Sequence, residues 1–232
     1  MPDTVIHYAD DVMLSTKGTF EEHLIQMDIV LQRFEDHNIK IQPGKVCLAM
    51  ETLEFLGIVW DRGILKVPEA KLSAFKNYPT PKTPKQAKSF VCAMSYYRRF
   101  IPRFAELSKP IMDLSTLHPK EFKWAPQNDL QFKHLISQLI QHSSLYLPDP
   151  EKTFYVQTDA SDVAGAGRVF QKDSDGSELL ISCISRTFSK TECKYGAFRK
   201  EVLALLYTLK SMDFFLRFAK KLIILTDAKS IL

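Results

Sequence analysis

The spacing of hydrophobic and polar positions changes twice along the chain and divides it into three segments. Residues 1–78 alternate short apolar runs with one amphipathic stretch, residues 79–148 show helical spacing, and residues 149–232 return to strand-like runs before a long helical stretch. Proline-rich boundaries separate the segments at residues 79–84 and 147–150. Three prolines within six residues cannot lie inside a helix or a central strand, so they form a stiff linker. We therefore predict an α/β (α+β) chain built from three parts.

Turn and cap residues mark where several of the expected helices and strands begin or end. A turn at Asp10-Asp11 joins the first two strands, Thr83 caps a helix that starts at Pro84, and Asp175-Gly176 forms a hairpin turn. Periodicity then assigns the remaining bounds. The expected strands cover residues 5–9, 12–14, 53–59, 154–158, 167–171, 179–184 and 222–226, and the expected helices cover 20–37, 103–115, 126–142 and 198–218 besides the one at Pro84.

Three of the expected helices have apolar positions at helical spacing, which predicts one buried face on each. The last expected strand, residues 222–226, is entirely apolar except for its final residue, as in a central strand of a covered sheet. The predicted buried positions are Leu24, Met27, Leu31 and Phe34 in the first helix, Ala87, Phe90, Val91 and Met94 in the helix after Pro84, and Val202, Leu205, Leu206, Leu209 and Leu216 in the last.

Basic residues concentrate in the middle of the chain. Residues 71–120 contain ten Lys or Arg and two acids, a balance of +8, so the remainder carries −4 of the overall +4. A basic middle between acidic flanks indicates a polyanion contact there and cation-binding carboxylates outside it. A solvated lysine-rich surface is the alternative that charge alone leaves open.

The four cysteines have neither CxxC spacing nor a neighbouring Cys/His cluster. This pattern predicts reduced thiols in an intracellular protein rather than a zinc site. No apolar run approaches the roughly 18 residues that span a bilayer. The first residues also lack the basic and then apolar pattern of a secretory signal, so we expect no membrane contact.

Three acidic residues of the last segment are candidates for a metal site. Asp159 ends the first strand of this segment, Asp227 follows its fourth, and Glu201 lies at the edge of the helix face predicted to meet the sheet. If the first and fourth strands are parallel neighbours, both aspartates open onto the same sheet end beside Glu201. The alternative is ordinary: Asp227 can cap a following helix, and a single Glu on a helix usually faces solvent.

Clustered carboxylates repel one another unless cations lie between them. Oxygen ligands select hard ions, so Mg²⁺ or Mn²⁺ is the expected cofactor. Two such ions in one active site activate a water and stabilise the leaving 3′ oxygen in phosphodiester hydrolysis. The last segment is thus a candidate two-metal nuclease.

Three motifs in order strengthen this interpretation: Thr158-Asp159-Ala160-Ser161-Asp162, Lys200-Glu201-Val202-Leu203-Ala204 and Leu225-Thr226-Asp227. Together they resemble the RNase H domain of long-terminal-repeat retrotransposon Pol polyproteins, of the gypsy or Bel-Pao type. The resemblance implies that Asp159, Glu201 and Asp227 are catalytic metal ligands that cut the RNA strand of an RNA–DNA hybrid. It also implies a fourth ligand further on, so we expect residues 149–232 to be a truncated RNase H-like domain.

The first two segments resemble the palm and thumb of retrotransposon reverse transcriptases. The resemblance rests on Tyr8-Ala9-Asp10-Asp11, then Phe55-Leu56-Gly57, then Tyr96-Tyr97-Arg98-Arg99-Phe100-Ile101-Pro102. It implies that residues 1–78 are the C-terminal part of the palm and residues 79–148 the thumb and connection. An Asp-Asp pair in a tight turn is also common for purely conformational reasons.

By the same resemblance, Asp10 is a catalytic metal ligand of DNA synthesis and Asp11 its electrostatic neighbour. Phe55, Leu56 and Gly57 would form the turn that supports the primer end. Lys45 either approaches the departing pyrophosphate or is simply solvated. A polymerase palm needs another Asp from an earlier strand, and the residues before the hairpin do not supply one. We expect the fingers and the first palm motif to be missing. We therefore predict no primer extension by this chain alone.

The basic helix after Pro84 is the predicted duplex track, where positive side chains neutralise phosphates without reading sequence. A hybrid would be recognised by its A-form-like shape. Tyr96 and Tyr97 either contact sugars or pack in the core, and helical spacing favours the core for Tyr97. The predicted phosphate contacts are Lys85, Lys88, Arg98, Arg99 and Arg103.

The resemblance implies an enzyme fragment, an RNA-directed DNA polymerase and ribonuclease H. Its partners would be primer-template and RNA–DNA hybrid, dNTPs in the full-length enzyme, and the rest of the polyprotein. The expected location is the cytoplasm, in virus-like particles, or the nucleus. Two alternatives remain: a catalytically dead remnant that still binds nucleic acid, and an unrelated α/β phosphotransfer domain, which leaves the ordered motifs unexplained.

Overall fold

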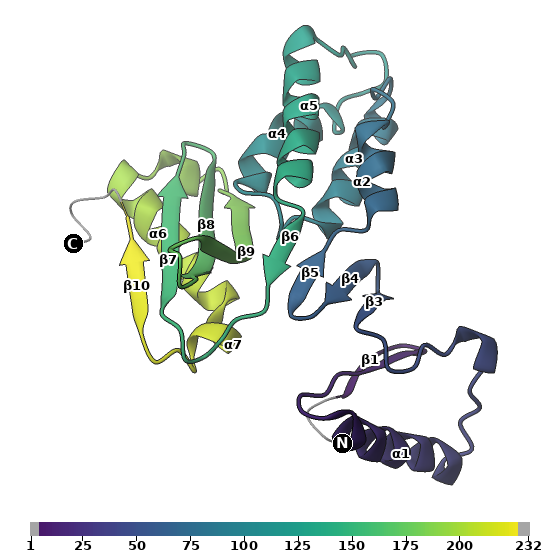
Figure 1. The fold of residues 1–232 in the computed structure, drawn as a ribbon. Coiled ribbons are helices and arrows are strands. Elements are labelled where there is room, and N and C mark those ends of the chain that lie inside the picture. The colour runs from purple at the N-terminus through teal and green to yellow at the C-terminus, as the bar shows by residue number, and fades with distance from the viewer. Residues whose placement is uncertain (1–4, 227–232) are drawn as a thin grey trace. The chain divides into compact units, whose positions relative to one another are not determined.

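The computed structural model describes residues 5–226, which contain seven α-helices and ten strands (Figure 1). The chain separates into two compact units, Met1–Arg62 and Gly63–Leu232. No helix among the described residues is long and apolar enough to cross a membrane.

The first unit is built from two hairpins and one helix. Thr19 begins the helix with a capping box, because its Oγ1 accepts the backbone N–H of Glu22 at 3.2 Å while Glu22 Oε2 accepts the N–H of Thr19 at 2.8 Å. Val30 is the buried residue of this helix, whereas Leu24 and Leu31 are 40% and 42% exposed, contrary to the predicted stripe. The elements are β1 Val5–Tyr8, β2 Asp11–Leu14, α1 Phe20–Asp36, the 3-10 turn Pro43–Lys45, β3 Thr52–Phe55 and β4 Ile58–Asp61.

The single strand predicted over residues 53–59 is wrong, because two antiparallel strands occupy this region. Phe55 pairs with Ile58, and the two residues between them, Leu56 and Gly57, both have positive φ, at 50° and 68°. Positive φ at both central positions is the requirement of a two-residue type I′ hairpin turn. The turn itself was predicted at these residues, but its consequence for the strand was not.

The second unit begins with helices that pack on one another. Ala87, Phe90, Val91 and Met94 are all buried, which confirms the predicted stripe. Tyr97 is also buried and Tyr96 is exposed, as helical spacing favoured. The elements are β5 Ile64–Lys66, α2 Glu69–Lys76, α3 Pro84–Tyr96, α4 Phe104–Leu114, α5 Pro126–Gln141 and β6 Ser144–Tyr146, with β6 antiparallel to β5.

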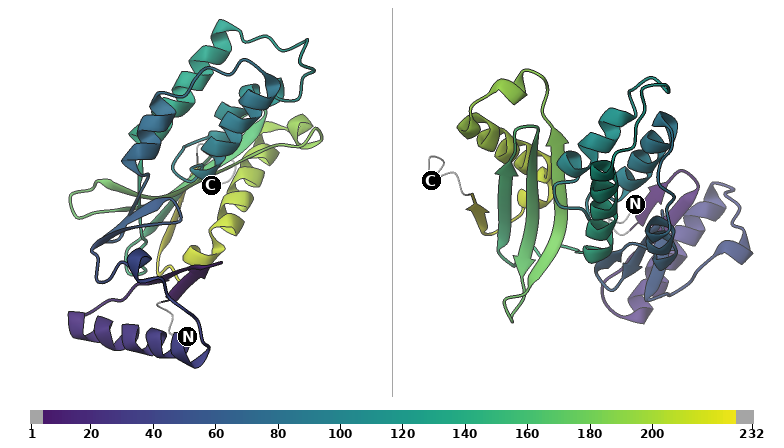
Figure 2. Two further views of the ribbon diagram at one scale, coloured as in Figure 1. Left: turned by 90° about the vertical axis from the view of Figure 1, so that its right-hand side faces the viewer. Right: turned by 90° about the horizontal axis from the view of Figure 1, so that it is seen from above.

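A four-stranded sheet in the order β10-β7-β8-β9 forms the rest of this unit. Strands β7 and β10 are parallel neighbours, which is the condition set above for the two aspartates to open onto the same sheet end, and Leu225 lies opposite Gln157. Helix α6 covers one face of the sheet, and α4 lies against its other face at β8 and β9 (Figure 2). The elements are β7 Phe154–Ala160, β8 Ala164–Lys172, β9 Glu178–Thr187, the 3-10 turn Glu192–Lys194, α6 Ala197–Ser211, α7 Asp213–Leu216 and β10 Leu222–Leu225.

Two glycines of β8 set how closely α6 approaches the sheet. A Cβ at Gly165 would lie 3.0 Å from Ala204 Cβ, and one at Gly167 would lie 2.2 Å from Thr208 Oγ1. Ala204 and Thr208 therefore form the buried face of α6 opposite β8, with Leu205 and Leu209 packed beside them. Leu206, predicted to be buried, is 47% exposed because the small residues face the glycines instead.

Replacing Gly167 with alanine is expected to lower the free energy of unfolding by about 1–3 kcal/mol, because the new methyl group overpacks a closed interface. Thermal or chemical unfolding followed by circular dichroism measures the loss. Adding Thr208→Ala removes two of the three clashing atoms, so the double variant should lose less than the sum of the single losses. Gly196→Ala, where a Cβ meets nothing within 4 Å, is the control. Additive effects of the 167 and 208 changes would contradict the packing described.

The cysteines differ in accessibility. Cys47 and Cys92 are exposed, Cys193 is partly buried and Cys183 is buried in β9. Burial raises the pKa of the Cys183 thiol to about 12, so little reactive thiolate forms there near neutral pH. At pH 8 we expect a thiol reagent to modify Cys47 and Cys92 first and Cys183 only after unfolding, as read by peptide mass spectrometry. Labelling of Cys183 as fast as Cys92 in the folded protein would contradict this.

Candidate functional site

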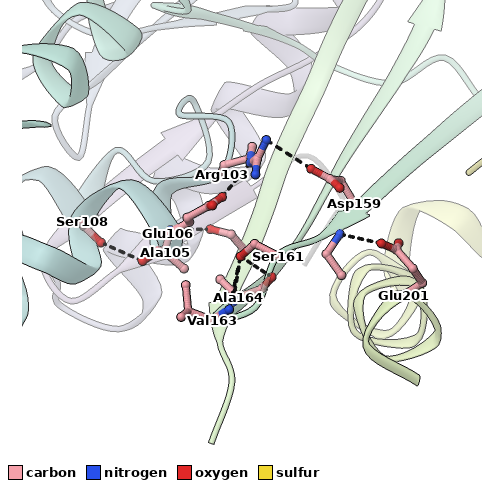
Figure 3. A network of polar contacts seen from close by, with 11 residues as sticks. Arg103, Ala105, Glu106, Ser108, Asp159, Ser161, Val163, Ala164 and Glu201 are labelled. Atoms are coloured by element: carbon pink, nitrogen blue, oxygen red, sulfur yellow. Dashed lines mark hydrogen bonds and ion pairs between the residues drawn. The ribbon is translucent and has the colours of Figure 1, made fainter. Parts of the chain in front are cut away.

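Two of the candidate acidic residues, one on a strand and one on a helix, lie at the same end of the sheet. Asp159 is the penultimate residue of β7, and its side chain is 47% exposed. Glu201 lies in the second turn of α6, and its Oε1 accepts the backbone N–H of Ala160 at 3.1 Å (Figure 3). This hydrogen bond ties the helix to the end of β7, directly beside Asp159. The structure thus places two of the three acidic residues singled out in the sequence at the same strand end.

The third, Asp227, lies outside the described residues. Within residues 5–226, no three His, Cys, Asp or Glu side chains are grouped closely enough to hold a metal ion. The donors at the end of β7 are carboxylate oxygens, the type that hard divalent cations prefer. The Asp159 carboxylate forms an ion pair with a cationic side chain of the protein, so positive charge can reach it.

That cationic group is Arg103, which comes from the other side of the sheet. Its Nη1 lies 3.2 Å from Asp159 Oδ2, and its Nε donates to Glu106 Oε2 at 2.7 Å (Figure 3). The hydrogen bond with Glu106 raises the pKa of Arg103, and the charges of Glu106 and Asp159 add to this against partial desolvation. The sequence predicted Arg103 as a phosphate contact and gave no sign of its ion pair with Asp159.

A second ion pair next to the site was not predicted from the sequence either. Lys200 is buried, and its Nζ donates to Asp162 Oδ1 at 2.8 Å, which lowers the pKa of the exposed Asp162 carboxyl. Lys200 precedes Glu201 on α6, and Asp162 follows β7. The pair therefore links the same helix to the same strand end as the Glu201 hydrogen bond. Both residues lie inside the quoted motifs, which was the only available signal.

The predicted phosphate contacts fall into two groups. Lys85 and Lys88 are exposed on α3. Arg98 and Arg99 instead approach β9, because Arg98 Nη2 donates to the carbonyl of Ser185 and the carbonyl of Arg99 accepts the N–H of Cys183 at 2.7 Å. These two residues attach the end of α3 to the sheet. Their role toward phosphates stays a prediction, as it does for the lysines.

The candidate polymerase residues all lie in the first unit. Asp10 and Asp11 are exposed at the β1–β2 turn, where Asp11 pairs with Tyr8 and Ala9 has a φ of 49°. Positive φ at a non-glycine residue is uncommon and marks a tight, specified turn. The Phe55–Gly57 segment forms the β3–β4 turn described above. Lys45 is exposed, at the end of the 3-10 turn.

Two protein-family models match the chain. Residues 2–60 match "Reverse transcriptase (RNA-dependent DNA polymerase)", and residues 124–224 match "RNase H-like domain found in reverse transcriptase". The two matches occur in the order that the motifs predicted, and they confirm the resemblance to reverse transcriptase and RNase H.

Curated relatives agree with the family models. The chain is 34% identical over 206 residues to the retrovirus-related Pol polyprotein from transposon 412 of Drosophila melanogaster, and 32% identical over 210 residues to that from transposon 297. These alignments cover 88% and 90% of this chain but only 16% and 19% of the relatives. The chain therefore spans less than a fifth of the length of either relative.

Solved structures show the same fold. A foamy viral protease-reverse transcriptase in complex with RNA/DNA hybrid superposes with a TM-score of 0.78 at 22% identity, covering 97% of this chain and 30% of that one. The same viral protein in complex with dsDNA gives 0.77 at 23% identity, covering 98% and 47%. The likeness extends over almost all of the chain.

Proposed function

We propose that this chain, a reverse transcriptase and RNase H-like fragment of a retrotransposon Pol polyprotein, hydrolyses the RNA strand of an RNA–DNA hybrid at the end of β7. The observation that carries the proposal is the hydrogen bond from Ala160 N–H to Glu201 Oε1, which holds Glu201 at the strand end that carries Asp159. A carboxylate pair on adjoining elements, open to solvent on the Asp159 side, is an arrangement suited to binding cations beside a phosphodiester.

The metal ligands would be Asp159, Glu201 and Asp227, the last of which follows β10 by two residues in the sequence. Two Mg²⁺ or Mn²⁺ ions would supply activation of the attacking water and stabilisation of the leaving oxygen. The chain's own contribution is to hold the carboxylates in place. Strand β7 fixes Asp159, α6 fixes Glu201, and the Lys200–Asp162 pair holds the helix against the strand end.

Nucleic acid would reach the site from the basic middle segment. Exposed Lys85 and Lys88 on α3 offer phosphate contacts, and α4 leads from there to the sheet. The bound RNA/DNA hybrid of the foamy viral structure supports the same ligand class for this chain. The proposed partners are therefore primer-template and RNA–DNA hybrid, recognised through backbone charge and shape.

The first unit would contribute to DNA synthesis in the longer protein. Asp10 is the proposed metal ligand and Asp11 its neighbour, and the turn of Phe55, Leu56 and Gly57 would support the primer end. The two exposed acids in a tight hairpin turn support this assignment. In the longer protein, this unit would act on a primer-template with dNTPs.

The decisive experiment is cleavage of an RNA–DNA hybrid labelled on the RNA strand. We expect products with Mg²⁺ or Mn²⁺, none with EDTA, and none from double-stranded DNA of the same sequence. Asp159→Asn is the control for the site. Tight hybrid binding without cleavage, also after C-terminal extension of the chain, would overturn the proposal in favour of a catalytically dead binding remnant.

A further inference from the structure

Arg103 is held between two carboxylates that belong to different parts of the second unit. Glu106 lies on its own helix, α4, whereas Asp159 lies on the sheet. The guanidinium uses different nitrogens for the two contacts, Nε for Glu106 and Nη1 for Asp159. It can therefore keep one carboxylate while releasing the other.

We propose that Arg103 is a displaceable counter-ion of the nuclease site. It neutralises Asp159 while no divalent cation is bound there, and it turns to Glu106 and a hybrid phosphate when a cation takes Asp159. This inference rests on the proposed metal-dependent function. It adds a residue outside the RNase H-like segment that couples the occupancy of the site to nucleic acid.

The ion pair between Arg103 and Asp159 is weak enough for a divalent cation to replace Arg103. The side chains of Arg103 and Asp159 are 49% and 47% exposed, so water screens the pair on both sides. A buried pair would resist separation, because each charge would lose its only compensation. Glu201 is held at the same strand end by the N–H of Ala160, so releasing Arg103 without a replacement cation would leave Asp159 without its charge partner near a second acidic residue. The exchange therefore favours a divalent cation over an empty site.

Contacts of the neighbouring residues hold the backbone of Arg103 in an uncommon conformation. Its φ of 53° is left-handed, which is uncommon for a non-glycine residue and needs support from its neighbours. That support comes from β9: Ser185 Oγ accepts the N–H of Ala105 at 3.0 Å, and the carbonyl of Arg99 accepts the N–H of Cys183 at 2.7 Å. Contacts on both sides of Arg103 thus direct its side chain toward the end of β7.

The released side chain has room to move. Arg103 and Glu106 line a groove of about 660 Å³ together with Lys109, Gln131 and His134. A guanidinium that leaves Asp159 can stay paired with Glu106 at the edge of this groove. It then presents its free nitrogens to a phosphate, the group that guanidinium forks bind best.

The exchange makes two opposite predictions for binding. In the free protein Arg103 competes with the divalent cation, so removing its charge should tighten metal binding. With the cation bound, Arg103 contributes to hybrid affinity, so its removal should weaken hybrid binding. Because linkage is reciprocal, metal and hybrid should each raise the affinity for the other, and this coupling should depend on Arg103.

Isothermal titration of Mn²⁺ into the full chain without nucleic acid tests the first prediction. Arg103→Gln should bind the cation about two- to fivefold more tightly, the ratio expected for loss of a partly exposed ion pair. Glu106→Gln should bind it more weakly, because Arg103 is then left with Asp159 alone. Lys133→Gln is the matched control: it removes the same charge from the neighbouring helix α5, where its ion pair is with Asp129 at 2.7 Å. That variant should bind like the original chain.

Fluorescence anisotropy with a hybrid whose RNA carries 2′-O-methyl groups, and so resists cleavage, tests the second. Arg103→Gln should lose hybrid affinity mainly when Mn²⁺ is present, and Arg103→Lys should restore part of it. A merely structural role for Arg103 would lower affinity equally with and without the cation, and that result would overturn the inference.

The variant Asp159→Asn distinguishes failure of the proposed metal site from failure of the proposed role of Arg103. If this variant binds Mn²⁺ as well as the original chain, the proposed metal site itself is wrong. If it binds Mn²⁺ more weakly while Arg103→Gln matches Lys133→Gln, the site stands and the counter-ion role of Arg103 is refuted.

Discussion

An asparagine at residue 159 is expected to slow hybrid cleavage by about a thousandfold or more, because it removes several kcal/mol of transition-state stabilisation that depends on the ligand's charge. Asparagine keeps the shape of the side chain but not its negative charge. The side chain is half exposed, and its one charged contact in the described structure is Arg103. The fold should therefore survive the change, and the loss should appear in the rate of the chemical step.

Single-turnover cleavage at saturating Mg²⁺ measures this rate, and circular dichroism checks the fold. The matched control is Asp113→Asn, another aspartate in a partly exposed ion pair, with Lys109 on α4. Its effect on cleavage should stay within a few fold. A rate for the 159 variant within tenfold of the original would exclude Asp159 as a metal ligand. The same defect in both variants would indicate a general loss of charge or structure.

The sequence predicted the larger elements of the fold because these have enough residues to show a period. The four buried positions of α3 repeat at helical spacing and all proved buried. The order of strands and helix allowed the parallel pairing of β7 with β10 that the structure shows. By contrast, β5 and β6 have three residues each, and Ile64 pairs with Tyr146, 82 positions later. Such short strands exist only through their partner, so no local pattern indicates them.

Packing also overrode local pattern at α6. Leu206 fits the apolar stripe by its chemistry, yet it is exposed. The two β8 glycines admit Ala204 and Thr208 at close range, so the helix presents small residues to the strand. A hydrophobic pattern favours the larger side chains as the buried face. It cannot foresee that a strand without side chains at two positions will select the smaller ones.

Some residues of the candidate site could be predicted from the sequence, and others could not. Asp159 and Glu201 were predicted because each is defined by its position at the end or the edge of a regular element. Arg103 is 56 residues from Asp159 in the chain, and the docking of α4 on β9 brings them together. Its left-handed backbone also has no local signature, since arginine is not a residue that favours that region. Contacts of this kind depend on tertiary structure alone.

Replacing Phe90 with alanine is expected to lower the free energy of unfolding of the second unit by about 3–5 kcal/mol, through lost burial and the cavity left behind. Phe90 is fully buried in α3. Its ring centroid lies 4.5 Å from that of Phe132 on α5 and 5.1 Å from that of Tyr78. No single neighbour can fill the space, because the ring joins two helices and the segment between α2 and α3.

Trp124 provides a local probe of this loss. Its ring lies 5.9 Å from that of Phe132, which contacts Phe90 directly. The chain has two tryptophans, so a Trp60→Phe background leaves Trp124 as the only one. Urea unfolding followed by its fluorescence should show a lower midpoint for Phe90→Ala. Phe218→Ala, the same change at a side chain that is 67% exposed, should shift the midpoint little.

The same variant should also change metal binding at the nuclease site, although Phe90 lies within the helical part. Helices α3 and α4 carry the contacts with β9 that place Arg103 beside Asp159. If those helices loosen as one body, Mn²⁺ affinity in the Phe90→Ala chain should rise toward that of Arg103→Gln at urea concentrations that unfold the helices but leave the sheet folded. Unfolding of helices and sheet in a single step, with no such interval, would show that the contacts between them stabilise both parts as one cooperative unit.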